Sequence, residues 1–245
     1  ADIHKLQIVD CEFNSNKAEA GGGAIALRGY IHNGVIAGCT FTGCSAQYGG
    51  AVDLSGNMGY FEFRDSDAKQ IIFQNCSATN RGGAVSIRST EIKNSANRTR
   101  YTRSNTVFFN GCSFDNCDSV SHGGGIAVLA QVHTFQVTGC DFTNCSTQMN
   151  GGGISIDAAD LPDNFKGSAS TDPDWSSTLN KCETCTANSI DFGTPLSYHF
   201  NWGTDDVPDH KSWIKTVSID SGCTFTNCTA TGTMNTEKTS ISGGN

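Results

Sequence analysis

A short motif recurs along the whole chain, and it limits more than any other feature what the chain can fold into. Each copy has a phenylalanine, most often in Cys-x-Phe, and a second marked residue three positions later. The copies begin at Cys11, Cys39, Ile71, Cys112, Cys140, Asn180 and Cys223. The copy at Asn180 is degenerate because Cys182 stands in the Phe position. Copies of one unit indicate one structural element that is repeated and stacked.

Within each copy, apolar and polar residues alternate with the period of a β-strand, and no segment shows a sustained helical period. A glycine cluster and an apolar pair follow, as in Gly49-Gly-Ala-Val52 and Gly82-Gly-Ala-Val85. The pattern fits a solenoid or a sandwich of hairpins. Repetition favours the solenoid, because identical side chains then stack along one axis. We therefore predict an all-β, single-stranded parallel β-helix of about seven coils.

Residues 1–245 form one domain in this interpretation, and three longer segments interrupt the repeat. They are 88–106, 157–179 and 190–216. The first carries a basic run that includes Arg88, the second is polar, and the third is the most aromatic part of the chain. We expect loops that leave the stack at these places.

The glycine motifs and the Phe-containing motifs resemble the repeats of chlamydial polymorphic membrane proteins, which carry Gly-Gly-Ala-Ile and Phe-x-x-Asn. Similar repeats occur in secreted algal and protist proteins with a right-handed, pectate-lyase-like β-helix. This chain departs from the pattern where cysteine replaces the Asn, as at Cys44 and Cys76. The resemblance implies a surface or extracellular adhesion role and transfers no catalytic residue.

The twelve cysteines lie at recurring spacings without the histidines of a zinc site, which favours disulfides made in an oxidising compartment. Neighbouring coils lie about 4.8 Å apart, and a disulfide needs Cα atoms roughly 4.4–6.8 Å apart, so equivalent cysteines of adjacent coils can pair. The predicted pairs are Cys11–Cys39, Cys44–Cys76, Cys112–Cys140, Cys117–Cys145, Cys185–Cys228 and Cys182–Cys223. Pairing within a coil, such as Cys39 with Cys44, is one alternative, and a metal or redox role for Cys182 and Cys185 is another.

Other features also favour secretion. Asn75, Asn97, Asn144 and Asn227 each begin an Asn-x-Ser/Thr glycosylation acceptor. Asn75, Asn144 and Asn227 each precede a cysteine that is expected to point inward, so alternation along the strand would point these asparagines outward. They would then lie in one column, on every second coil, whereas Asn97 lies in a polar insert. The start Ala-Asp-Ile-His is typical of a processed N-terminus or a fragment. We predict a secreted or cell-surface protein.

The charge balance argues against one class of partner. Asp and Glu number 24 against 16 Lys and Arg, so the formal net charge is −8. Nucleic-acid backbones are held by clustered Lys and Arg, and we expect no nucleic-acid partner. The sequence contains no run of about 18 apolar residues, so we expect no membrane-spanning helix.

Candidate catalytic groups are few. Asp53, Asp65 and Asp67 lie near repeat strands but are scattered. In the densest cluster, Asp205 and Asp206 would act as an acid/base pair, although a solvated acidic turn is the simpler interpretation. We expect no catalytic residue, no metal ligand and no cofactor.

The segment 190–216 also holds Tyr198, Trp202 and Trp213. Exposed rings of this kind form platforms for sugars or protein partners. With Asp205 and Asp206 they make a candidate ligand or partner loop. The alternative is that they cover the flank of the solenoid as a satellite core.

Neither end of the sequence shows the polar cap that usually hides the terminal edge of a solenoid. We expect either a longer chain or copies that stack head to tail, a contact that generates an open fibre. The predicted function is an extracellular structural and adhesive rod that self-associates end to end, with cell-surface glycans as a further candidate partner. The alternative is a polysaccharide-binding or polysaccharide-cleaving β-helix.

Overall fold

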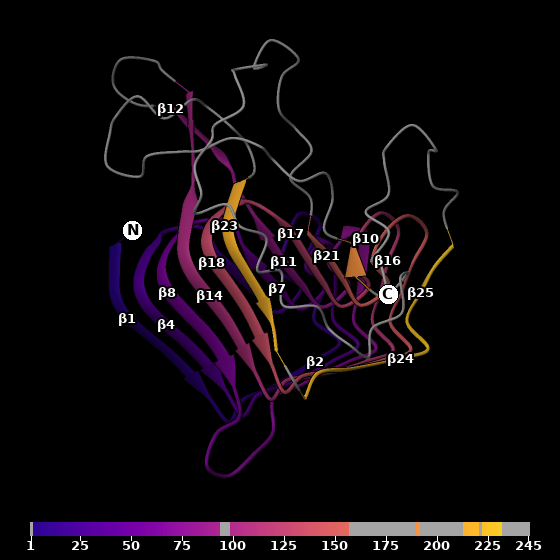
Figure 1. Ribbon diagram of the computed structural model, residues 1–245. Coiled ribbons are helices and arrows are strands. Elements are labelled where there is room, and N and C mark those ends of the chain that lie inside the picture. Colours follow the sequence, from indigo (N-terminus) through magenta and orange to yellow (C-terminus); the bar gives the residue numbers. More distant parts are fainter. Residues whose placement is uncertain (1, 94–98, 157–189, 192–212, 221, 232–245) are drawn as a thin grey trace.

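The computed structural model describes residues 2–93, 99–156, 190–191, 213–220 and 222–231 (Figure 1). Within these ranges the regular structure consists of β-strands, without helices, and each of the four large sheets is parallel. We call the four large sheets A, B, C and D, and the chain passes through them in this order. Each pass, called a coil below and numbered along the chain from β1, lies against the previous one. The arrangement is compatible with the parallel β-helix that the repeat predicts.

Sheets A and B run in chain order from one end of the stack to the other (Figure 1). Sheet A consists of β1 (Asp2–Val9), β4 (Tyr30–Ala37), β8 (Asn57–Arg64), β14 (Arg103–Asn110), β18 (Gln131–Thr138) and β23 (Trp213–Ile219). Sheet B consists of β2 (Glu12–Asn14), β5 (Thr40–Thr42), β9 (Ile72–Gln74), β15 (Ser113–Asp115), β19 (Asp141–Thr143) and β24 (Thr224–Thr226).

Sheets C and D complete each coil with short strands. Sheet C consists of β6 (Ser45–Tyr48), β10 (Ser77–Arg81), β16 (Asp118–Ser119), β20 (Ser146–Thr147) and β25 (Thr229–Ala230). Sheet D consists of β3 (Ile25–Leu27), β7 (Val52–Leu54), β11 (Val85–Arg88), β17 (Ile126–Leu129), β21 (Ile154–Ile156) and β22 (Ile190–Asp191). An antiparallel pair, β12 (Glu91–Lys93) and β13 (Thr99–Tyr101), projects from the stack (Figure 1). The interval 88–106, expected to be a loop, therefore contains this hairpin.

The repeated phenylalanines form one continuous stack through the interior. Successive ring centroids, from Phe13 to Phe225, lie 4.6 to 4.8 Å apart, with the rings tilted by 4° or less from parallel. Period-two alternation in sheet B turns each phenylalanine inward and its two neighbours outward. Phe41, Phe73 and Phe114 are fully buried. The Cys-x-Phe motif thus specifies both the strand and its inner face.

The glycine clusters form the corner between sheets C and D. Gly82 has a φ of +68°, in the left-handed region that favours glycine. A Cβ on Gly83 would clash with the backbone carbonyl of Gly124 in the next coil. Neighbouring coils approach too closely at this corner for a side chain, which explains why two glycines recur there.

The described part of sheet B has six strands, one fewer than the seven motif copies predict. β24 pairs directly with β19, so that Phe225 lies opposite Phe142. The sequence predicts a further coil between them, formed by the degenerate copy at Cys182. That copy lies outside the described residues, and the pairing leaves no room for a coil at the expected place. Cys223 and Cys228 therefore lie beside Cys140 and Cys145.

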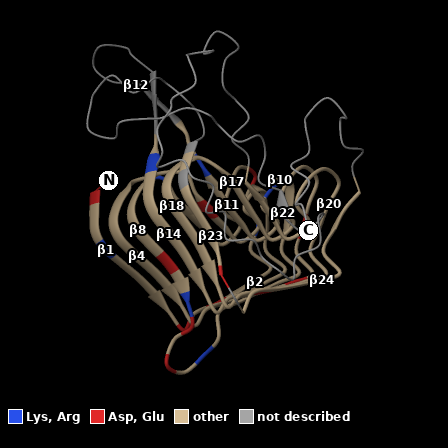
Figure 2. Ribbon diagram, viewed as in Figure 1, with Lys and Arg blue, Asp and Glu red and all other residues tan. Residues whose placement is uncertain are grey.

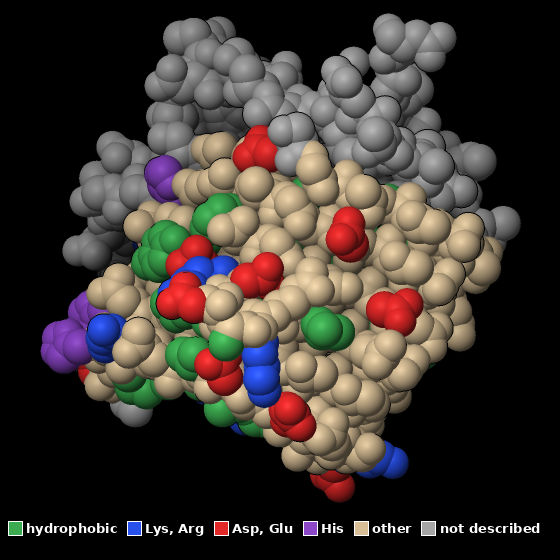
Figure 3. Space-filling model, turned by 90° about the horizontal axis from the view of Figure 1, so that it is seen from below, with side chains coloured by type: hydrophobic (Ala, Val, Ile, Leu, Met, Phe, Trp, Pro, Cys, Tyr) green, Lys and Arg blue, Asp and Glu red, His purple; other side chains and the backbone are tan. Residues whose placement is uncertain are grey.

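The outer surface carries few charges. Figure 2 shows that most of the ribbon bears neither acidic nor basic side chains. Figure 3 shows the underside of the stack mainly as uncharged polar side chains and backbone, with acidic side chains scattered over it. The outward positions of sheet B include Thr40 and Thr42 on β5 and Thr224 and Thr226 on β24. This face is polar and uncharged over much of its area.

Candidate functional site

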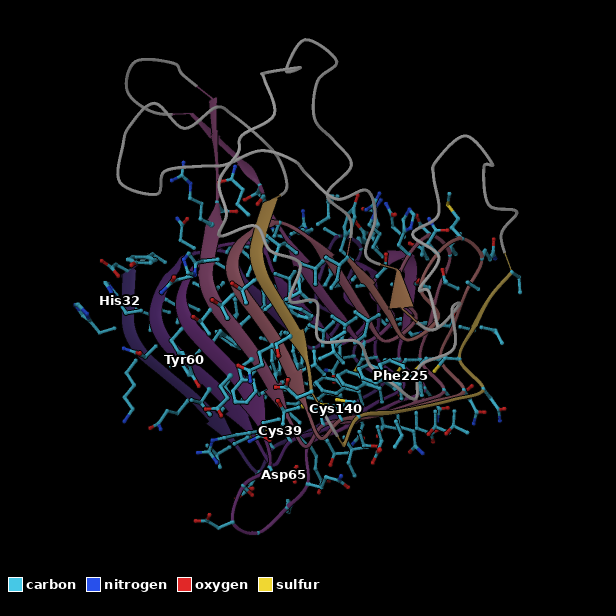
Figure 4. The ribbon with its side chains drawn as sticks, viewed as in Figure 1. His32, Cys39, Tyr60, Asp65, Cys140 and Phe225 are labelled. Carbon is cyan, nitrogen blue, oxygen red and sulfur yellow. The ribbon has the colours of Figure 1, made fainter. Side chains whose placement is uncertain are left out.

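The cysteines line two columns along the stack, one at the beginning and one at the end of the strands of sheet B. The first column, between sheets A and B, contains Cys11, Cys39, Ile71, Cys112, Cys140 and Cys223. The second column, between sheets B and C, contains Asn16, Cys44, Cys76, Cys117, Cys145 and Cys228. Of the cysteines in these columns, only Cys11 is exposed. Figure 4 labels Cys39 and Cys140 at the corner where sheet A meets sheet B.

The ten described cysteines are free thiols in this structure, and most of them hydrogen-bond to backbone carbonyls. In the second column each Sγ donates to the carbonyl of the phenylalanine in the preceding coil. Cys76 Sγ lies 3.5 Å from Phe41 O, and Cys117 Sγ lies 3.5 Å from Phe73 O. A thiol is a weak donor, and here it points at a carbonyl of a sheet B strand in the preceding coil. The cysteine thus takes a backbone-bonding role in the column even without a disulfide.

Burial raises the pKa of several of these thiols, whereas hydrogen bonds from thiols of the neighbouring coils, that of Cys117 first, lower the pKa of Cys76 and of Cys145. Desolvation holds the pKa of Cys112 and of Cys117 well above the ordinary value, with a neighbouring thiol in the next coil adding to the shift. It raises the pKa of Cys223 to about 11. A protonated, buried thiol is a poor nucleophile. The thiols with a raised pKa, such as Cys112 and Cys117, therefore have the chemistry of structural cysteines.

A predicted disulfide requires that its two cysteines occupy equivalent positions in adjacent coils. Cys11 and Cys39, Cys44 and Cys76, Cys112 and Cys140, and Cys117 and Cys145 occupy equivalent positions in adjacent coils. These four predicted pairs would leave Cys223 and Cys228, both in the last described coil. Their predicted partners, Cys182 and Cys185, lie outside the described residues. Cys223 is also adjacent to Cys140, and Cys228 to Cys145, so alternative pairings exist at this end.

Three of the four glycosylation acceptors lie together at an exposed turn that follows sheet B. Asn75, Asn144 and Asn227 are exposed and have φ values of 52° to 54°. Asn116 occupies the same column, and its amide donates to Asn75 Oδ1 at 2.6 Å. Because β19 pairs with β24, Asn144 and Asn227 lie on neighbouring coils. The expected spacing on every second coil is therefore wrong for this pair. Asn97 lies outside the described residues.

The candidate carboxylates do not converge. Asp53 is fully buried and paired with Arg88, whose Nε and Nη2 each lie 2.8 Å from its oxygens. Asp65 Oδ1 accepts a hydrogen bond from the backbone N–H of Ile71 at 2.9 Å and closes the loop between β8 and β9. Among the described residues, no group of three or more His, Cys, Asp or Glu side chains is arranged to hold a metal ion. Both carboxylates have structural partners that the sequence did not indicate.

The predicted ligand loop lies almost entirely outside the described residues. Tyr198, Trp202, Asp205 and Asp206 belong to this undescribed part. Trp213 begins β23, and its backbone pairs with Gln131 in sheet A. At least one of the aromatic positions therefore belongs to the stack itself.

The first coil differs from the others in its exposure. β1 lies at one edge of sheet A, and β2 at the same edge of sheet B. Ile3, Leu6, Ile8 and Phe13 are only partly buried, although their equivalents in the next coil, such as Phe41, belong to the core. Within the described ranges, no strand pairs with the outer edge of β1. Among the described residues, the first coil therefore has partly buried apolar side chains that no further coil covers.

Comparison of the chain with family models, with curated proteins and with solved structures finds no match in any of the three. The structure supports the all-β, parallel architecture on its own evidence, and the resemblance to polymorphic membrane protein repeats stays a prediction. In the described part, no helix is long and apolar enough to cross a bilayer.

Proposed function

We propose that this chain is an extracellular structural and adhesive protein, a stiff parallel β-helix that stacks end to end with copies of itself. The observation that carries the proposal is the open first coil, where β1 and β2 present strand edges and half-buried apolar side chains. Exposed edges of this kind pair readily with further strands. A second copy of the chain is the occupant to which the proposal commits.

Matching side chains at the two ends of three interior columns support this choice. The column that begins with Phe13 ends with Phe225. Following the register of sheet A, the column of Leu6 ends with Val217, and the column of Ile8 ends with Ile219. A copy whose last coil lay on the first coil of the next would continue these three columns with apolar contacts. Such a head-to-tail contact repeats into a fibre.

Disulfides between coils form the second part of the proposal. Equivalent cysteines flank paired strands of adjacent coils, and the usual spacing of neighbouring strands, about 4.8 Å, lies within the Cα separation of a disulfide, roughly 4.4–6.8 Å, which supports this part. Each bridge would close a loop of roughly 30–45 residues and contribute on the order of 3–4 kcal/mol to stability by loop entropy. Peptide mapping of alkylated, non-reduced protein tests this part. We expect Cys11–Cys39 and Cys44–Cys76, whereas bridges within a coil, or wholly free thiols, would contradict it.

The stacking proposal is tested by charging the open edge. Leu6→Lys places a cation on the inner, half-buried position of β1, and Gln7→Lys places the same cation on the exposed neighbour. Sedimentation velocity at several concentrations should show assembly of the wild type and of Gln7→Lys, and a monomer for Leu6→Lys. Thermal unfolding checks that the variant has kept its core.

Two outcomes would overturn self-stacking. The first is a wild-type protein that stays monomeric at all concentrations. If its β1 amides are then protected from hydrogen exchange, other residues of its own chain cover the edge. The second is unchanged assembly of Leu6→Lys. The polysaccharide alternative depends on the loop residues Trp202, Asp205 and Asp206, and it stays a prediction.

A further inference from the structure

A cavity opens on the outer side of the stack, at the corner between sheets C and D. Its volume is about 350 Å³, within the range of small-molecule sites. It spans three coils, because its lining comes from the end of β6, from β10 and β11, and from β17. The lining residues are Tyr48, Asn80, Arg81, Ser86, Arg88, Ser89, Thr90, Ala127 and Leu129. No sequence motif singled out this set.

Arg88 is held in place from two sides. Its Nε and Nη2 pair with the two oxygens of the fully buried Asp53. Its guanidinium carbon lies 4.5 Å from the centre of the Tyr48 ring, in a cation–π contact. The carboxylate neutralises the charge and the ring fixes the plane of the guanidinium. Within the described residues, the Nη1 group has no hydrogen-bond partner, so its two hydrogens remain available.

Other lining groups are also unused. Asn80 Nδ2 donates to the Tyr48 hydroxyl at 3.0 Å, and among the described residues the Asn80 amide oxygen has no donor. Ser86 is only 2% exposed, and its hydroxyl makes no hydrogen bond within the described part of the chain. By contrast, the hydroxyl of Ser89 donates to Thr102 O, and that of Thr90 to Ser55 O. Ser86 lines the cavity, and its Oγ is not enclosed in the interior, so a ligand or water in the cavity can bond to this hydroxyl.

The unused groups define the chemistry of a ligand. Arg88 Nη1 only donates, the Asn80 amide oxygen only accepts, and the Ser86 hydroxyl does both. A simple anion would satisfy donors alone. A molecule with several hydroxyl groups can satisfy all three, and its carbon-bound hydrogens can rest on Ala127 and Leu129. The Asp53–Arg88 pair contributes no net charge, so the Arg88 guanidinium by itself does not favour a carboxylate or a phosphate. Arg81 is the second cation of the lining, and a charged probe is therefore included in the test.

We propose that this cavity binds an uncharged, hydroxyl-rich ligand, a single neutral sugar unit of a glycan. The site is independent of the end-to-end stacking proposed above, because its lining lies on the flank of coils two to four. It is also separate from the loop at 190–216, in which the sequence placed the ligand residues. A rod with such sites on its flank would hold neutral glycans along its length.

The test uses the whole chain and methyl glucopyranoside or cellobiose as probes. Titration followed by amide and Arg side-chain NMR should shift the signals of Ser86, Arg88 and Ala127 in a saturable manner. Ser86→Ala should weaken binding about tenfold through the lost hydrogen bond. Ser113→Ala, the same change at an outward position of sheet B, should leave binding unchanged. Asn80→Ala provides a second variant and should also weaken binding.

Several results would overturn the proposal. Absence of saturable shifts in the wild type would mean that the cavity holds solvent only. Tighter binding of glucuronate than of the neutral glucoside would mean an anion site. Unchanged affinity in both Ser86→Ala and Asn80→Ala, with native amide spectra, would place the sugar elsewhere.

Discussion

The first coil and the third coil are built from the same repeat, yet they differ in how their side chains are covered. Phe73 in the third coil is fully buried and stacks on Phe41 and on Phe114, each with a ring separation of 4.8 Å. Phe13 in the first coil is partly buried, and within the described residues it stacks on Phe41 alone. The repeat motif determines that a side chain points inward. How much its burial contributes to stability depends on whether a neighbouring coil covers it on both sides.

The largest effect is expected from removing one ring of the stack. Phe73→Ala leaves a cavity between two rings and should lower the free energy of unfolding by about 3–5 kcal/mol. Phe13→Ala removes a ring that is stacked on one side and should cost less than half as much in dilute, monomeric protein. Urea unfolding monitored by circular dichroism measures both. Equal losses would mean that the first coil is covered as fully as the third.

Assembly sharpens this comparison. If copies stack as proposed, Phe13 gains a second neighbour, and the cost of Phe13→Ala should rise toward that of Phe73→Ala at concentrations where the wild type assembles. A concentration-independent cost for Phe13→Ala would contradict stacking at this edge.

Ion pairs give the next largest contrast. Asp53→Asn in the second coil leaves the Arg88 cation beside a fully buried neutral group and should cost about 3 kcal/mol. The pair between Asp2 of the first coil and His32 of the second joins an exposed carboxylate to a partly exposed imidazole, and its Nε2–Oδ1 distance is 2.9 Å. Asp2→Asn should therefore change stability little. Thermal unfolding of the two variants at pH 7 checks the ordering, and a larger loss for Asp2→Asn would refute it.

The smallest expected effect is a difference in alkylation rate between two thiols of the first cysteine column. Cys11 is exposed, whereas burial raises the pKa of Cys39 in the next coil. In reduced native protein at pH 8, iodoacetamide should modify Cys11 about tenfold or more faster than Cys39. With a pKa of about 11, Cys223 should gain reactivity only as the pH approaches that value. Mass spectrometry of timed samples measures these rates, and comparable rates for Cys11 and Cys39 would contradict the difference in burial.

Much of the architecture could be predicted because the repeat is local. Each Cys-x-Phe segment fixes an inner and an outer face, and each glycine pair marks a corner where coils approach closely. The adjacency of Cys11 with Cys39 and of Cys117 with Cys145 followed from these short motifs.

The remaining features depend on contacts between distant residues. The sequence placed the Cys182 copy in the stack, whereas Cys140 and Cys223 lie on adjacent strands although 83 residues separate Thr224 from Asp141. A motif alone does not show whether its copy forms a coil of the stack. That depends on which strands are hydrogen-bonded to each other, and distant residues determine this pairing. The Asp53–Arg88 pair was missed for a similar reason. It joins outward positions of β7 and β11, which are neighbours in sheet D although the two residues lie 35 positions apart in sequence, and the sequence predicts a loop from Arg88 onward.

Electron microscopy of non-reduced protein at several concentrations tests the central claim most directly. We predict fibres in which the coils continue from copy to copy, with an axial repeat of roughly 29 Å for six coils at the ~4.8 Å strand spacing. The repeat would be longer if further coils belong to the stack. Monodisperse short rods at every concentration, or fibres without a repeat along the strand-stacking direction, would contradict the account.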